Sequence, residues 1–366
     1  MFATLIRFGI EVEIIMKKEI IEFEKRNNLI NCQKHPTLDL LIWNYNQRCQ
    51  FEKKWDEYTI ISRGLITDKN GNIVARPFKK YFNLNETKET KIENLPIVIP
   101  KITEKLDGSL GIQYYDGDKV CIATRGSFNS EQAIFATKWM EKFKKSDFLE
   151  GFTYLYEIIY PENRIVVDYQ GKKELFLLAV KNTETGEEID FKKEAEKLGV
   201  SYPKIINKDL SFLIKYLSQM KQDEEGFVLQ YDNDFRIKMK GEEYLRLHRL
   251  ITGFSTISIW DCLKNSQDLS SILQNVPDEF YNWIKIKEQE LRNNFNRLKE
   301  VAIKGFENVK NLPNRKSQAL TVLKDYKEIS SAIFGLLDNK NIDEIIWKKL
   351  RPKYELPFKT DDKEAL

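Results

Sequence analysis

The stretch EKLDGSLG at residues 104–111 combines a lysine, an acidic side chain and a glycine within four positions. Lys105 stands two residues before Asp107, and Gly108 follows at once. A lysine amine becomes a nucleophile when it loses its proton, and a glycine lets a ligand approach the backbone closely. The simpler interpretation is a solvated turn, because Asp-Gly is among the commonest turn dipeptides.

A second candidate is the basic stretch FRIKMK at residues 235–240. Side chains alternate between the two faces of a strand, so Arg236, Lys238 and Lys240 would share one face and the apolar residues the other. Such a face could bind a polyphosphate. The alternative is an ordinary amphipathic strand with its lysines in solvent.

Two acidic residues lie in apolar surroundings. Glu157 is in the middle of FTYLYEIIY, and Glu225 precedes the glycine of EGFVLQY. A carboxylate is rarely buried unless it has a partner, so both predict nearby cations. Structural pairing with lysines would also explain either one.

These residues depend on short strands to position them. The runs at 110–115 and 120–125 read as strands joined by the turn Asp116-Gly117-Asp118. Pairing them would bring Lys105 and Arg125 to the same end of a sheet. From about residue 241 the strand signals fade, and apolar residues recur at three- and four-residue steps, which is typical of helices.

Composition narrows the chemistry. With 59 basic and 56 acidic residues, bulk charge is balanced, and no apolar stretch is long enough to span a membrane. Four scattered cysteines suggest neither a disulfide framework nor a metal knuckle, so we expect a reducing, cytoplasmic location, in a host cell if the protein is viral. Two histidines leave little material for a histidine metal cage or a serine-histidine triad. The chain lacks GxxxxGK[ST], HExxH, GxGxxG and GxSxG.

The order of these elements resembles the covalent nucleotidyltransferases, the superfamily of ATP-dependent ligases and mRNA capping enzymes. KLDG resembles the nucleophile motif, YEIIY the central acidic strand, EGFV the Glu-Gly strand and KMK the closing Lys-x-Lys. The resemblance implies an α+β fold whose nucleotidyltransferase domain is built on antiparallel sheets, followed by an all-α C-terminal domain.

A closer resemblance is to RNA ligase 1 of T-even phages. It rests on residues 61–87, on TRGSFNSEQA at 124–133 and on YPENRIVVDY at 160–169, and Arg125 stands where that type often has lysine. We expect residues 1–246 to form the adenylyltransferase domain, with 1–40 as a less certain extension. Residues 247–366 would form an all-helical domain that binds RNA, and in the type resembled this domain favours tRNA.

The resemblance implies roles for individual residues. Lys105 would be the nucleophile, with Asp107, Glu225, Lys238 and Lys240 as catalytic partners. Asp107 and Glu225 would hold Mg²⁺ or Mn²⁺, directly or through water. The expected ATP contacts, besides the catalytic lysines, are Glu104, Gly108, Arg63, Lys80, Phe82, Arg125 and Glu157. Phe82 could equally be a core residue.

The implied activity is ATP-dependent joining of RNA 5′-phosphate and 3′-hydroxyl ends through a lysyl-AMP intermediate. Repair of a tRNA broken in its anticodon loop is the expected role, with an end-healing kinase as a functional partner and no membrane. The alternatives are an mRNA guanylyltransferase or DNA ligase of the same superfamily, and a non-catalytic RNA-binding protein. Both enzymatic alternatives would place an OB-fold, with several strands, after Lys240.

Overall fold

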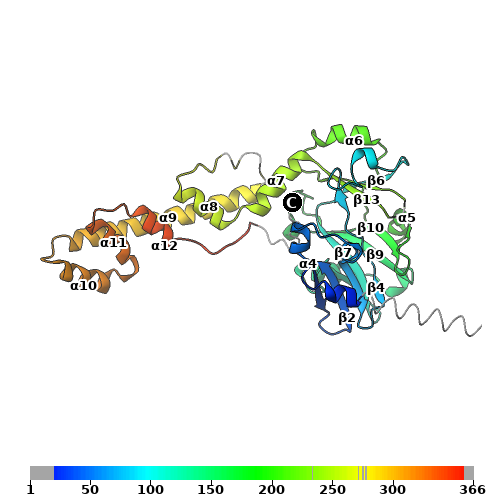
Figure 1. Ribbon diagram of the computed structural model, residues 1–366, viewed down its shortest axis with the longest axis horizontal. Helices are drawn as coiled ribbons and strands as arrows, with labels where there is room; N and C mark the ends of the chain where they lie inside the picture. The colour runs from blue at the N-terminus through cyan, green and yellow to red at the C-terminus, as the bar shows by residue number, and fades with distance from the viewer. Residues whose placement is uncertain (1–19, 233, 271, 274–275, 277, 358–366) are drawn as a thin grey trace, which may run out of the picture. The chain divides into compact units, whose positions relative to one another are not determined.

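The chain forms two compact units, one that runs to His248 and one that starts at Arg249. The computed structural model describes residues 20–232, 234–270, 272–273, 276 and 278–357. The first unit is α+β with mostly antiparallel sheets and the second is helical, so the predicted fold class is confirmed (Figure 1). No described helix is both long and apolar enough to cross a membrane.

The earliest described strands form a four-stranded antiparallel sheet in the order β1-β2-β3-β4. Their bounds are Ile30–Lys34, Leu40–Tyr45, Arg63–Asp68 and Ile73–Ala75. Two short helices, α2 (Gln47–Phe51) and α3 (Glu57–Ile61), connect β2 to β3. The region expected as an N-terminal extension therefore supplies the first strand of this sheet.

Two further sheets carry the predicted motifs, in the orders β11-β10-β9-β7-β8 and β5-β13-β12-β6. The strands of the five-stranded sheet are β7 (Ser109–Asp116), β8 (Lys119–Ala123), β9 (Phe152–Ile159), β10 (Glu174–Asn182) and β11 (Glu188–Ile189). Those of the other sheet are β5 (Phe82–Asn83), β6 (Lys101–Lys105), β12 (Gly226–Gln230) and β13 (Arg236–Lys240). The β7–β8 hairpin pairs Asp116 with Lys119, which confirms the predicted turn.

Alternation along the strands separates the core from the site. On β9, Tyr154 and Tyr156 are fully buried in a core that α4 (Glu131–Met140) and α5 (Phe191–Leu198) cover. On β13, Ile237 and Met239 join a second core that includes Leu213 of α6 (Leu210–Leu217). The basic face of β13 is not in solvent, because Lys238 is only 6% exposed.

The second unit contains no strand among its described residues, which does not fit the OB-fold of capping enzymes and DNA ligases. Its helices are α8 (Thr256–Lys264), α9 (Asp278–Val309), α10 (Arg315–Asp325), α11 (Ser330–Leu337) and α12 (Asp343–Lys349), and the unit boundary falls within α7 (Glu242–Gly253). The long α9 buries Leu298, Ala302 and Val309 against Ile333 and Ile346 of the following helices.

Candidate active site

Lys105 is the last residue of β6, and its ammonium group makes an ion pair with a buried carboxylate. Glu225 Oε2 lies 2.8 Å from Lys105 Nζ, and Glu225 Oε1 lies 3.1 Å from Lys240 Nζ. Gly226 is the direct pairing partner of Lys105 on one side and of Lys240 on the other. Because opposite residues of antiparallel strands point to the same face, the two lysines flank a position that has no side chain. One carboxylate thereby joins two cations from two strands.

Gly226 is required for this arrangement. Its φ is +148°, and a Cβ atom there would lie 1.9 Å from the carbonyl oxygen of Met239. Any other residue would push β12 away from β13. Glu225 itself is 2% exposed. Burial raises the pKa of its carboxyl, but Lys105 and Lys240 outweigh burial and hold the pKa below its usual range.

Asp107 is buried, and its carboxylate is already engaged. One oxygen, Oδ1, accepts a hydrogen bond of 2.8 Å from the Tyr244 hydroxyl. The other, Oδ2, accepts the N–H groups of Val166 and Val167, both at 2.9 Å. Burial, and next the nearby charge of Glu225, raise the pKa of Asp107. These partners suit Asp107 to positioning the loop that follows the lysine, and its predicted metal contact, directly or through water, stays a prediction.

Glu157 fixes the same loop from the other side. Its Oε1 accepts the Gly108 N–H at 2.9 Å. A Cβ atom on Gly108 would lie 2.5 Å from the carbonyl oxygen of Ile158, so this close approach needs a glycine. Burial raises the pKa of Glu157 to about 8, although Lys105 acts in the opposite direction.

Three of the predicted cations lie around aromatic rings. The Arg63 guanidinium lies 5.4 Å from the Tyr81 ring centre, and Arg125 donates a 3.2 Å hydrogen bond to the Tyr45 hydroxyl. Lys80 is 8% exposed, and its ammonium lies 5.2 to 5.5 Å from the rings of Tyr45, Trp55 and Phe82. Such cation–π contacts hold a cation in place without neutralising its charge.

The predicted residues fall into two groups, those that line a pocket and those that do not. Most of the predicted residues line one pocket: Arg63, Arg125, Lys105, Asp107, Gly108, Glu157, Glu225 and Lys240. Glu104 lines an adjoining pocket, together with Lys105 and Glu157. The Glu104 carboxylate is bound to the Lys204 N–H at 2.8 Å. Lys80, Phe82 and Lys238 do not line either pocket. Phe82 packs edge-to-face on Trp55 instead, with ring centres 5.6 Å apart.

Sequence reasoning missed four aromatic residues of the site. Phe78 and Tyr81 line both pockets, Tyr244 lines the first, and Tyr169 binds the loop after the nucleophile. Tyr81 precedes Phe82 in the chain, and neighbouring residues in an extended segment point to opposite sides. For Tyr244 the available signal was its place in the helical run that follows the Lys-x-Lys strand.

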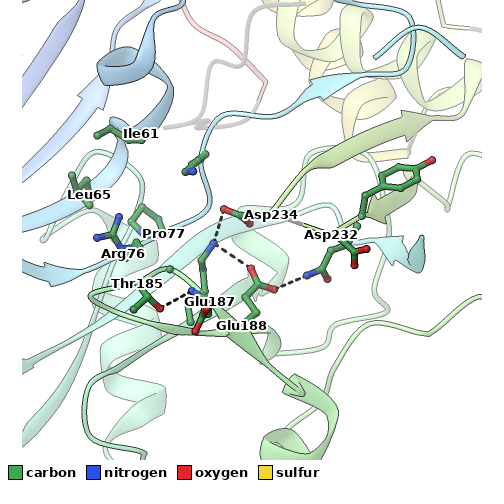
Figure 2. A pocket seen from close by; sticks show the side chains of 14 residues that line it. Ile61, Leu65, Arg76, Pro77, Thr185, Glu187, Glu188, Asp232 and Asp234 are labelled. Carbon is green, nitrogen blue, oxygen red and sulfur yellow. Dashed lines mark hydrogen bonds and ion pairs between the residues drawn. The ribbon is translucent and has the colours of Figure 1, made fainter. Parts of the chain in front are cut away.

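A charge network borders the second pocket, which Arg236 of this network also lines. Lys181, which is 1% exposed, is 3.0 Å from Asp234 and 3.2 Å from Glu188. Arg236 binds the same two acids. Glu188 and Asp234 also line another pocket, and Figure 2 shows the hydrogen bonds and ion pairs of their carboxylates there as dashed lines. Arg236, predicted on the basic face of β13, is thus a structural residue whose charge is balanced.

The sequence model of the RNA ligase family matches residues 61–244. An RNA ligase of Rhodothermus phage RM378 is 24% identical, and the alignment covers 68% of this chain and 73% of that protein. A putative RNA ligase of Thermovibrio ammonificans is 27% identical over 67% of each chain. A putative bifunctional polynucleotide kinase/RNA ligase of Autographa californica nuclear polyhedrosis virus is 28% identical over 58% of this chain and 34% of its own.

Solved structures resemble the chain more distantly. A putative ATP-dependent DNA ligase from Aquifex aeolicus covers 88% of both chains with a TM-score of 0.45 and 15% identity. A Naegleria gruberi RNA ligase with ATP and Mn is 16% identical over 41% of this chain and 52% of its own, with a TM-score of 0.33. The family match spans half of the chain and contains every site residue that the sequence predicted. The chain therefore belongs to the RNA ligase family.

Proposed function

We propose that this RNA ligase uses ATP and joins a 5′-phosphate to a 3′-hydroxyl in three steps, with Lys105 as the nucleophile. In the first step, the neutral amine of Lys105 forms a P–N bond with the α-phosphorus of ATP. The bond to the β-phosphate oxygen breaks, pyrophosphate leaves, and the proton lost from the amine passes to solvent.

The second and third steps transfer the AMP and then release it. An oxygen of the RNA 5′-phosphate attacks the phosphorus of the lysine adduct, the P–N bond breaks, and Lys105 takes up a proton. The RNA 3′-hydroxyl then attacks the 5′-phosphorus, loses its proton to solvent, and AMP leaves. Positioning and electrostatics supply most of the catalysis in such displacements.

The observation that carries this proposal is the Glu225 carboxylate between Lys105 and Lys240. Lys105 is held at the edge of a pocket that Arg63, Arg125 and Lys240 also line. These cations suit the negative charge of a triphosphate, and Lys240 would stabilise charge on the α-phosphate oxygens. Lys80 lies outside the pocket lining and would act through the aromatic rings beside it.

ATP and a divalent cation are part of the proposal. The described residues bring no three His, Cys, Asp or Glu side chains together as metal ligands. This fits Mg²⁺ or Mn²⁺ held by one or two carboxylates, water and the nucleotide's phosphates, because Mg²⁺ dehydrates reluctantly. Asp107 and Glu225 line the pocket and would contact the cation, directly or through water. When bound, the cation would neutralise charge on the phosphate groups.

The roles of the two domains, the RNA substrate and the partner enzyme are also part of the proposal. Residues 1–246 would carry the adenylyl transfer and residues 247–366 would bind the RNA, with a tRNA cleaved in its anticodon loop as the substrate. An end-healing kinase would supply the 5′-phosphate, and the relative named as a kinase and ligase motivates this partnership. The four cysteines are described as free thiols, which supports a reducing intracellular location.

The first experiment is labelling of the protein by α-labelled ATP or GTP with Mg²⁺. We expect acid-stable label from ATP in the wild type and none in Lys105→Ala. Label from GTP alone would indicate a guanylyltransferase, and no label from either would overturn the proposed mechanism. Sealing of nicked RNA compared with nicked DNA then identifies the substrate. Lys69→Ala, which changes an exposed lysine that lines neither pocket, is the matched control.

A further inference from the structure

We infer that Tyr169 is a positioning residue that holds the nucleophile loop, residues 105–109, during chemistry at Lys105. The inference rests on the proposed function and adds a residue to its machinery. Tyr169 lies in the segment between β9 and β10, more than sixty positions from the lysine in sequence. It touches no reacting atom, and its effect would pass through the loop backbone.

Tyr169 contacts both residues that follow Lys105. Its hydroxyl oxygen accepts the backbone N–H of Asp107 at 2.7 Å. Its ring packs on the small apolar cluster formed by Leu106, Ile159 and Phe176. Leu106 is 6% exposed, so its side chain anchors the loop in this cluster. One side chain thus fixes the loop by a backbone hydrogen bond and by apolar contact.

Other residues of the segment between β9 and β10 bind the loop through hydrogen bonds to Asp107 and Ser109. Val166 and Val167 donate their N–H groups to the Asp107 carboxylate. Asn163 Oδ1 accepts the Ser109 hydroxyl at 3.1 Å, and Asn163 Nδ2 donates to the Ile158 carbonyl at 3.0 Å. The segment therefore ties the loop to the end of β9.

The opposite side of the loop is equally constrained. Gly108 donates to Glu157 and has no room for a Cβ atom against Ile158. The loop is held between β9 and the 163–169 segment, and the Tyr169 hydroxyl is the one side-chain acceptor described for the Asp107 N–H. Losing that acceptor would let the loop shift while leaving its apolar anchor intact.

The three reaction steps separate positioning from general stability. In the first two steps a bond forms or breaks at Lys105 Nζ. In the third step the lysine is not a reactant, because AMP is already on the RNA. A residue that positions the lysine should therefore affect adenylylation more than sealing of RNA supplied with AMP already attached.

The test is Tyr169→Phe in the full chain, which keeps the ring and removes the hydroxyl. We expect the single-turnover rate of lysine adenylylation to fall about 10- to 100-fold, because misplacing a reacting group by about 1 Å costs rate on this scale. We expect the half-saturating ATP concentration and the sealing rate of pre-adenylylated RNA to change by less than about threefold. Tyr156→Phe is the control, since it removes another buried hydroxyl, bonded to Gln113, from the core.

Two results would overturn the inference. One is an unchanged adenylylation rate in Tyr169→Phe while the wild type is active. The other is a parallel loss of adenylylation and sealing, which would show a general structural role. If the wild type itself forms no lysyl-AMP, the proposed function fails instead, and the two failures are thereby distinguished.

Discussion

The Glu225 carboxylate lies 2.8 Å from the Lys105 ammonium, and its second oxygen lies 3.1 Å from the Lys240 ammonium. This arrangement orients the Lys105 side chain before ATP binds. It also means that Lys105 must leave Glu225 and lose its proton before it can attack. A nearby cation favours that loss, because like charges lower the pKa of an amine. Glu225 therefore holds Lys105 in place, whereas the charge of Lys240 favours loss of the lysine proton.

The Glu225→Gln variant should lose both activity and stability. The amide cannot balance the charges of Lys105 and Lys240, so we expect adenylylation to slow by about 100-fold or more. Removing one partner of a buried ion pair typically lowers the free energy of unfolding by about 3–5 kcal/mol. We expect a smaller loss here, because the Lys105 side chain is 18% exposed. Label incorporation from ATP and urea unfolding measure the two effects. Asp223→Asn, two residues away and exposed, is the control. An active Glu225→Gln protein would contradict the role of this carboxylate.

The Glu157 carboxyl should make stability depend on pH. Its pKa is about 8 in the folded protein, against 4.5 ordinarily. Between these values the folded protein holds a proton that the unfolded chain has released. The free energy of unfolding therefore falls as pH rises through this window, and is constant with respect to this group above it.

Glu157→Gln should remove that decline, because the amide resembles the protonated acid and does not titrate. Urea unfolding of both proteins across about pH 5 to 9 measures the difference. In Lys105→Ala the decline should extend to higher pH, since the lysine charge lowers the pKa of Glu157. Parallel stability curves for wild type and Glu157→Gln would contradict the raised pKa.

The Lys181→Met variant should destabilise the first unit. Methionine leaves the half-buried carboxylates of Glu188 and Asp234 with only Arg236 to balance them. We expect a loss of about 3–5 kcal/mol in the free energy of unfolding. Lys69→Met breaks the exposed pair with Asp39 and should cost less than about 1 kcal/mol. Equal losses in the two variants would show that the network stabilises the protein no more than an exposed ion pair does.

Local sequence patterns located much of the site. The Asp116–Asp118 turn, the alternation of β13 and the glycines at 108 and 226 follow from turn chemistry and strand periodicity, which operate over a few residues. The order of the motifs also predicted that Lys105, Glu225 and Lys240 belong to one site. The structure places β12 between β6 and β13, which brings the three together.

What the sequence alone determined is the set of candidate site residues, the α+β unit and the helical unit after it. Only the tertiary structure decided which partners those residues have. The sequence did not indicate that the Asp107 carboxylate accepts hydrogen bonds from Val166, Val167 and Tyr244. The sequence left Phe82 open between the pocket and the core; in the structure Phe82 packs on Trp55, and Phe78 and Tyr81 line the pocket. The reason is physical: periodicity fixes which way a side chain points within its own strand, whereas its partners depend on how distant segments pack.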